Sequence, residues 1–233
     1  MEIFVRRILV VLFGDIALSD RIGVAQNLNK ATKNLFSGEQ AILPIPDDAP
    51  PEIPRIMLGD KDKIFHCYVS PKRLEFFLGQ QKGENKKLEE VQNDFLSQLT
   101  NIARAVKTEL GVKVERMGIV VNSAVFPKES PVDFLMKKFL KAGMIVAPRE
   151  LNLNFLHRFV LGEFKVNRWH RFRCLSPEDK EPFEEANALL AETDINTVSE
   201  IKYDFSAEQI PVFCSQVFTF MESDLKSLLA KED

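Results

Sequence analysis

Apolar and polar residues alternate along the chain with a period that changes between that of a strand and that of a helix. Residues 3–13 are apolar on both faces, which predicts a strand near the middle of a sheet. Residues 88–110 carry Leu, Val, Phe and Ile at steps of three and four before Gly111, so a long amphipathic helix is predicted there. Residues 206–230 repeat this pattern and predict a second long helix.

The segments between these elements predict shorter helices and strands. Helices are predicted over residues 20–36 and 131–141, and strands over residues 55–58, 63–69, 73–78, 112–126, 151–161, 164–174 and 190–204. Residues 43–54 hold five prolines, and each proline lacks a backbone N–H and restricts φ. This segment is therefore predicted to be an extended loop on the surface.

The order of these elements predicts the fold class. Residues 1–111 and 112–233 each follow the order β-α-β-β-β-α, which indicates two similar halves. The two long helices need a common apolar surface to cover. We therefore expect a compact α+β protein with a curved, mainly antiparallel sheet and both long helices packed on one face. This topology resembles the TATA-binding-protein-like fold and other duplicated α+β folds, although topology alone does not predict function.

Two short motifs add a second resemblance. Arg116, Gly118 and Asn122 follow the first long helix, one residue closer together than in an R-x-G-x-x-x-x-N motif, and Asp194, Asn196 and Thr197 form a D-x-D/N-T motif before the last helix. The stretches around them, residues 94–123, 191–200 and 205–230, resemble a sporadically distributed family of uncharacterised prokaryotic proteins. The family has no established activity. Its patchy distribution implies a gene from a mobile or defence-associated locus.

Composition narrows the functional classes. The 31 basic and 34 acidic residues give a net charge of −3, so the chain as a whole does not attract nucleic acid or an anionic membrane. The apolar run at residues 8–13 is too short to span a bilayer. Three distant cysteines without a C-x-x-C motif indicate reduced thiols in a cytoplasmic protein. No phosphate-binding loop, nucleophile elbow or zinc motif occurs, so we expect neither a cofactor nor a metal.

The strand predicted over residues 164–174 is the best candidate site. Alternation places Lys165, Asn167, Trp169, Arg171 and Arg173 on one of its faces. Residues 157–173 contain five Lys or Arg and one Glu, and a basic strand with the only Trp could hold phosphates and stack a base. The alternative interpretation is a solvated sheet face, or a sheet edge whose positive charge discourages pairing.

These observations predict a non-catalytic binding protein that recognises a macromolecular partner through a sheet face or edge, with protein as the first candidate and nucleic acid as the second. Self-association into a homodimer would use the same surface, and no membrane partner is expected. One alternative is an enzyme whose site gathers His66, His157, His170 and Asp194. Another is an apolar-ligand protein of the helix-grip type, since the chain has 19 Phe against 2 Tyr and 1 Trp.

Overall fold

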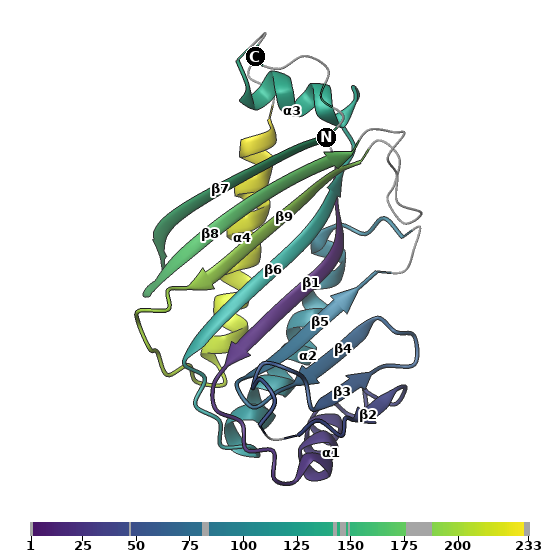
Figure 1. The fold of residues 1–233 in the computed structure, drawn as a ribbon, viewed down its shortest axis with the longest axis vertical. Coiled ribbons are helices and arrows are strands. Elements are labelled where there is room, and N and C mark those ends of the chain that lie inside the picture. Colours follow the sequence, from purple (N-terminus) through teal and green to yellow (C-terminus); the bar gives the residue numbers. More distant parts are fainter. Residues whose placement is uncertain are drawn as a thin grey trace.

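The computed structural model describes residues 2–46, 48–80, 84–141, 144, 148, 150–175 and 188–230. These residues form a nine-stranded antiparallel sheet and four helices, which confirms the α+β class (Figure 1). The strands are β1 (Ile3–Phe13), β2 (Gln40–Ile42), β3 (Ile56–Gly59), β4 (Phe65–Val69), β5 (Arg73–Gly79), β6 (Arg116–Val125), β7 (Glu150–Leu161), β8 (Phe164–Leu175) and β9 (Leu189–Thr197). The helices are α1 (Arg21–Ala31), α2 (Leu88–Thr108), α3 (Pro131–Phe139) and α4 (Gln209–Leu229).

The strands follow the order β2-β3-β4-β5-β1-β6-β9-β8-β7, so β1 is the central strand. Its register with β6 places Val10 opposite Ile119, and both side chains are fully buried. The next residue on the other face, Leu9, is only half-buried. The apolar character of β1 on both faces therefore reflects its position in the middle of the sheet.

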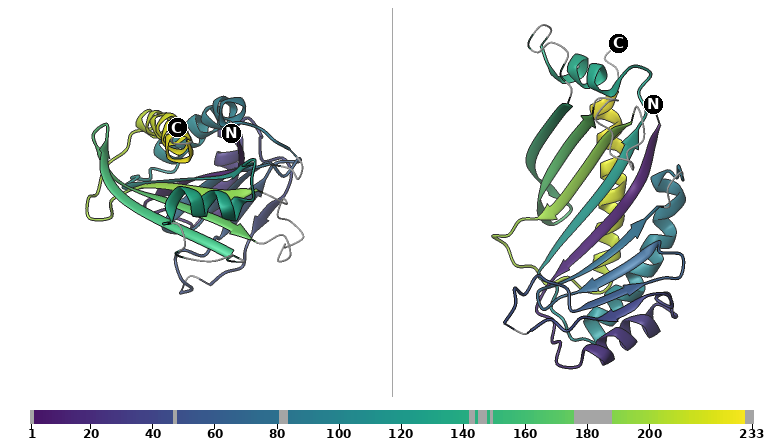
Figure 2. Two further views of the ribbon diagram at one scale, coloured as in Figure 1. Left: turned by 90° about the horizontal axis from the view of Figure 1, so that it is seen from above. Right: turned by 45° about the vertical axis from the view of Figure 1, so that its right-hand side comes forward.

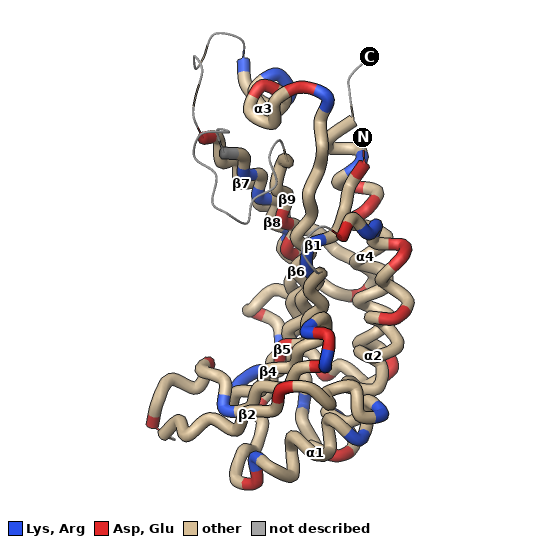
Figure 3. Tube along the Cα trace, turned by 90° about the vertical axis from the view of Figure 1, so that its right-hand side faces the viewer, with Lys and Arg blue, Asp and Glu red and all other residues tan. Residues whose placement is uncertain are grey.

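The long helices α2 and α4 lie on the same side of the sheet (Figures 1 and 2). Phe95 of α2 and Phe218 of α4 are fully buried there, with ring centroids 6.0 Å apart. No described helix covers the opposite side, which we call the open face. At both ends of the sheet, β7 and β2 curve away from α2 and α4 (Figure 3). The open face is thus the inner side of this curve.

Several predicted elements differ from the observed ones. Helix α1 ends at Ala31 instead of residue 36, and strand β6 begins at Arg116 instead of residue 112. Strand β9 ends at Thr197 instead of residue 204, because the Val198 N–H still donates to the Lys165 carbonyl but residues 199 and 200 then turn away. The chain returns at Tyr203 and Phe205, whose N–H groups donate to the Glu115 and Val114 carbonyls, and Phe205 forms an isolated bridge with Val114. The prediction also missed the short strand β2, which lies just before the proline-rich segment and pairs with β3.

The three thiols are free and buried in the described structure, at Cys67, Cys174 and Cys214. Burial is the main cause that raises the pKa of Cys174 to about 11, and it raises the pKa values of the other two thiols as well. A thiol with a raised pKa is largely protonated at neutral pH and is a poor nucleophile. These cysteines are therefore core residues and not candidates for catalysis.

Candidate binding surface on the open face of the sheet

Strand β8 places its five candidate residues on one face. Lys165, Asn167, Trp169, Arg171 and Arg173 all point to the open face, since the residues between them point to the helices. Strand β8 is not at the edge of the sheet, because β9 lies on one side of it and β7 on the other. The predicted alternation of this strand therefore matches its burial pattern.

The arginines of this surface are paired with carboxylates from neighbouring strands. The Arg171 guanidinium forms an ion pair with Glu192 of β9 and lies 3.4 Å from an oxygen of Asp194. Arg173 Nε lies 3.8 Å from a Glu150 oxygen on β7. Glu192 and Asp194 thus act as partners of a basic side chain.

Two of the three remaining basic residues of segment 157–173 also have acidic partners. Arg158 pairs with Glu200 at 3.1 Å, and Arg168 pairs with Asp224 at 2.7 Å on the helix-covered side. Four of the five Lys and Arg residues counted in the sequence therefore have acidic partners from outside the segment. Because opposite charges at this distance cancel their long-range field, the strand lacks the net positive charge that attracts a polyanion.

The four residues of the alternative enzymatic site do not meet, so that prediction was wrong. His66 lies on β4, and four strands separate β4 from β8, which is about 24 Å at the usual strand spacing. His170 points to the helices, whereas Asp194 of the neighbouring strand points to the open face. His157 lies on the edge strand β7 and stacks on Phe159.

His170 instead connects the sheet to α4. Its Nε2 lies 2.6 Å from an Asp224 oxygen, and its Nδ1 lies 2.9 Å from the Thr193 hydroxyl. Burial alone would raise the pKa of Asp224, but the hydrogen bond from His170 and the charge of Arg168 outweigh burial and lower this pKa below its usual value. The sequence signal for Asp224 was weak: a single carboxylate between Met221 and Leu225 of an apolar stripe.

Strand β7 is the outermost described strand on its side of the sheet. It is 12 residues long, and no described strand pairs with its outer side. Phe155, Leu156 and Val160 expose 40%, 54% and 62% of their surface. Natural sheets usually protect such edges with charged side chains, Pro or a very short strand. Strand β7 is long, lacks Pro, and carries only Glu150 and Arg158 as charged residues.

The hydrogen-bonding direction along β7 follows from the neighbouring strands. The Lys165 carbonyl accepts from Val198 on the β9 side, so Lys165 directs its backbone groups away from β7. Lys165 is opposite Val160, and groups alternate in direction along an antiparallel ladder. Leu156, Arg158 and Val160 therefore direct their N–H and C=O groups outward, where a further strand could pair with them.

Three arginines stack on aromatic rings of the open face. The pairs are Arg7 over Phe77 at 4.5 Å, Arg116 over Phe13 at 4.8 Å and Arg171 over Trp169 at 5.1 Å. Trp169 lies opposite Leu156, so this aromatic side chain adjoins the exposed edge. Arg and aromatic residues are enriched in the centres of protein–protein interfaces.

Comparison with known proteins does not assign the site. No protein-family model matches this sequence, and no curated protein is significantly similar to it. Within the described ranges, no group of three or more His, Cys, Asp or Glu side chains is placed to hold a metal ion. No helix in the described part of the chain is long and apolar enough to cross a membrane.

Proposed function

We propose that this protein is a non-catalytic binding protein that recognises a protein partner by pairing an extended segment of that partner with β7. The observation that carries the proposal is the open edge: a 12-residue strand with exposed apolar side chains and outward backbone groups. Adding a strand to such an edge satisfies a row of backbone donors and acceptors at once. Side chains of Leu156, Val160 and Trp169 would contact the side chains of the added strand.

The chemistry of the adjoining open face favours protein over nucleic acid. Its arginines Arg171 and Arg173 are balanced by Glu150, Glu192 and Asp194, whereas a phosphate-binding surface needs cations without such partners. Stacked Arg and aromatic groups beside apolar side chains are typical of contacts between proteins. A second copy of this chain is one such protein partner, because two β7 edges could pair with each other.

We also infer that residues 1–111 and 112–233 are two copies of one β-α-β-β-β-α unit. The strand order β3-β4-β5-β1 in the first half corresponds to β7-β8-β9-β6 in the second, and each half ends in a long helix. In the first half the outer edge of β3 is paired with β2. The corresponding edge of β7 has no described strand beside it, which supports its use for a partner.

A pair of substitutions at Leu156 tests the proposal. Leu156→Pro removes an outward N–H without breaking the bonds to β8, whereas Leu156→Val keeps the N–H and most of the apolar surface. Each tagged protein is used to capture partners from its native host, and each captured protein is then purified and titrated. Circular dichroism and thermal unfolding first establish that both variants fold.

We expect wild type and Leu156→Val to bind the same purified partner. Leu156→Pro should bind at least about tenfold more weakly, since the missing N–H leaves one carbonyl of the added strand unpaired, which costs about 1–3 kcal/mol. If the partner is a second copy of this chain, light scattering detects the dimer. A dimer in the wild type that is lost in Leu156→Pro also supports the proposal. The proposal is contradicted if a folded Leu156→Pro variant binds the partner, or dimerises, as tightly as the wild type.

A further inference from the structure

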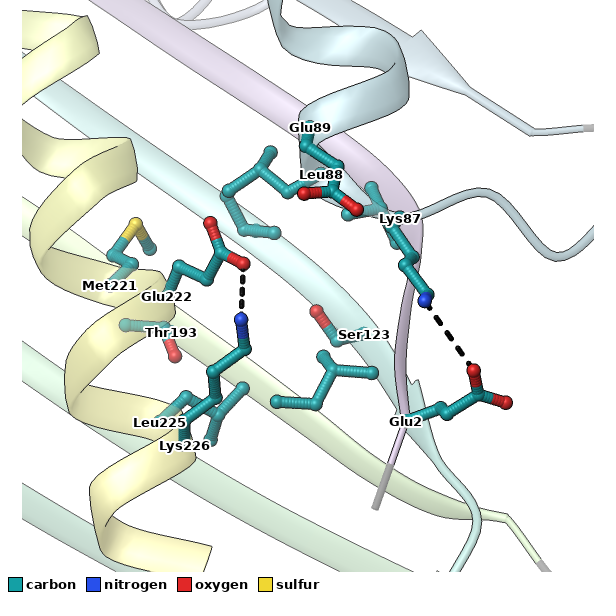
Figure 4. A pocket seen from close by; sticks show the side chains of 13 residues that line it. Glu2, Lys87, Leu88, Glu89, Ser123, Thr193, Met221, Glu222, Leu225 and Lys226 are labelled. Carbon is teal, nitrogen blue, oxygen red and sulfur yellow. Dashed lines mark hydrogen bonds and ion pairs between the residues drawn. The ribbon is translucent and has the colours of Figure 1, made fainter.

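A cavity lies on the helix-covered side of the sheet, away from the proposed binding edge. It has a volume of about 210 Å³ and lies between α4 and the first turn of α2, above β1, β6 and β9 (Figure 4). Its walls are mainly aliphatic and include Val5, Leu88, Val121, Met221 and Leu225. An apolar cavity of about 150 Å³ is enough to hold benzene, so this one has room for a small organic molecule.

Two hydroxyl groups form the polar part of the cavity floor. Ser123 of β6 is only 5% exposed, and its hydroxyl has no hydrogen-bond partner among the described residues. Thr193 of the neighbouring strand β9 is 2% exposed and also lines the cavity. A hydroxyl that lines the cavity without a protein partner is free to hydrogen-bond a ligand, so Ser123 offers a contact for a polar end.

The hydrogen bonds of His170 affect whether the Thr193 hydroxyl donates or accepts a hydrogen bond in the cavity. Asp224 has a lowered pKa and is ionised at neutral pH, so its carboxylate accepts a hydrogen bond from His170 Nε2. When Nε2 carries the only ring proton, Nδ1 accepts a hydrogen bond from the Thr193 hydroxyl. In this tautomer the Thr193 oxygen keeps only lone pairs for the cavity, which suits a ligand that donates a hydrogen bond.

Charged side chains at the mouth of the cavity exclude an anionic ligand. Glu2 pairs with Lys87 at 3.4 Å, and Glu222 pairs with Lys226 at 2.5 Å (Figure 4). Glu89 also lines the cavity, so three carboxylates face two ammonium groups and leave one net negative charge. This charge repels a carboxylate or phosphate and is compatible with a neutral or positive polar group.

We propose that this cavity binds a small amphipathic molecule with a hydrogen-bond-donating end, of the class of short-chain aliphatic amines or alcohols. The donor group would contact the oxygens of Ser123 and Thr193, and the hydrocarbon chain would lie between Leu88, Met221 and Leu225. The ligand would also fill the space between α4 and the start of α2. The inference does not depend on the proposed function, because β7 does not line the cavity.

Titrations of the full chain with 1-hexanol, hexylamine and hexanoate, followed by backbone amide NMR shifts, test this proposal. The variants are Ser123→Ala, which leaves the His170 contacts intact, and Thr193→Val, which removes the second hydroxyl without changing the side-chain shape. Thr219→Val is the matched control, because Thr219 lies on the exposed side of α4 and bonds only to the Ser215 carbonyl.

We expect the alcohol or the amine to shift the amides of β6 and β9 saturably, and hexanoate to bind at least about tenfold more weakly. Which of the two donors binds more tightly identifies the polar group. Each of Ser123→Ala and Thr193→Val should weaken binding about fivefold, the usual effect of one hydrogen bond, while Thr219→Val should not change it. No saturable binding of either donor, equal binding of hexanoate, or an unchanged affinity in Ser123→Ala overturns the proposal.

Discussion

His170 shows how a single residue gains its role from partners distant in the chain. Its ring is 2% exposed and contacts Thr193 of β9 and Asp224 of α4, which are 23 and 54 residues away. A buried imidazole with both nitrogens hydrogen-bonded is held in one orientation. The same contacts attach α4 to the sheet and leave the Thr193 oxygen facing the cavity.

The contacts of Asp224 predict a measurable contribution to stability. Asp224→Ala leaves His170 Nε2 and the Arg168 guanidinium without their acceptor in a largely buried place. We expect the free energy of unfolding, from urea titration, to fall by about 2–3 kcal/mol. Glu222→Ala is the control, because Glu222 forms only an exposed helical pair with Lys226, and its loss should change stability by less than about 0.5 kcal/mol.

Because folding lowers the pKa of Asp224, its contribution to stability depends on pH. A carboxylate whose pKa is lowered by folding stabilises the folded state fully above its unfolded pKa of about 3.9. The difference in stability between wild type and Asp224→Ala should therefore be constant near pH 7 and decrease as the pH falls below about 4. A difference that stays unchanged down to pH 3 would contradict the assigned ionisation.

The elements differ in how well local patterns predict them. Helix α2 was predicted almost completely, because its apolar residues repeat over 21 positions and lie on one buried face. The end of β9 was missed, since Ile201 and Tyr203 continue the alternation after the chain has left the sheet. Strand β2 has only three residues, and its pairing with β3 is a contact that local alternation does not reveal.

Strand β7 was predicted within one residue, but its place at the edge was not. Its apolar residues on both faces are equally typical of a central strand such as β1. Only the strand order distinguishes the two, because β1 has neighbours on both sides and β7 pairs with β8 alone among the described strands. The exposed Leu156 and Val160 thus became candidates for binding only once the sheet was assembled.

At the scale of the whole molecule, charge pairing between strands changes the functional interpretation. The sequence showed a basic strand, and its alternation correctly predicted which residues share a face. The carboxylates that neutralise it come from β7, β9 and α4, and no local count of charges could identify them. The candidate surface was therefore located from the sequence, but its electrostatic character was not.

This pairing predicts the response to nucleic acid. At 200 mM salt we expect single-stranded oligonucleotides to bind with a Kd no lower than about 10 µM. The Kd should depend only weakly on salt concentration, since few phosphate charges would be neutralised. Fluorescence anisotropy at 50 and 200 mM salt measures both quantities. Tight, strongly salt-dependent binding that Arg171→Ala abolishes would favour nucleic acid as the partner.

The most direct test of the account is amide hydrogen exchange along β7, measured by NMR with and without the captured partner. In the free protein the outward amides of Leu156, Arg158 and Val160 should exchange faster than those of Phe155, His157 and Phe159, which point to β8. Saturation with the partner should slow the outward amides at least about tenfold. If these amides exchange at the same rate in the saturated complex, no strand pairs with β7 and the proposed function is wrong.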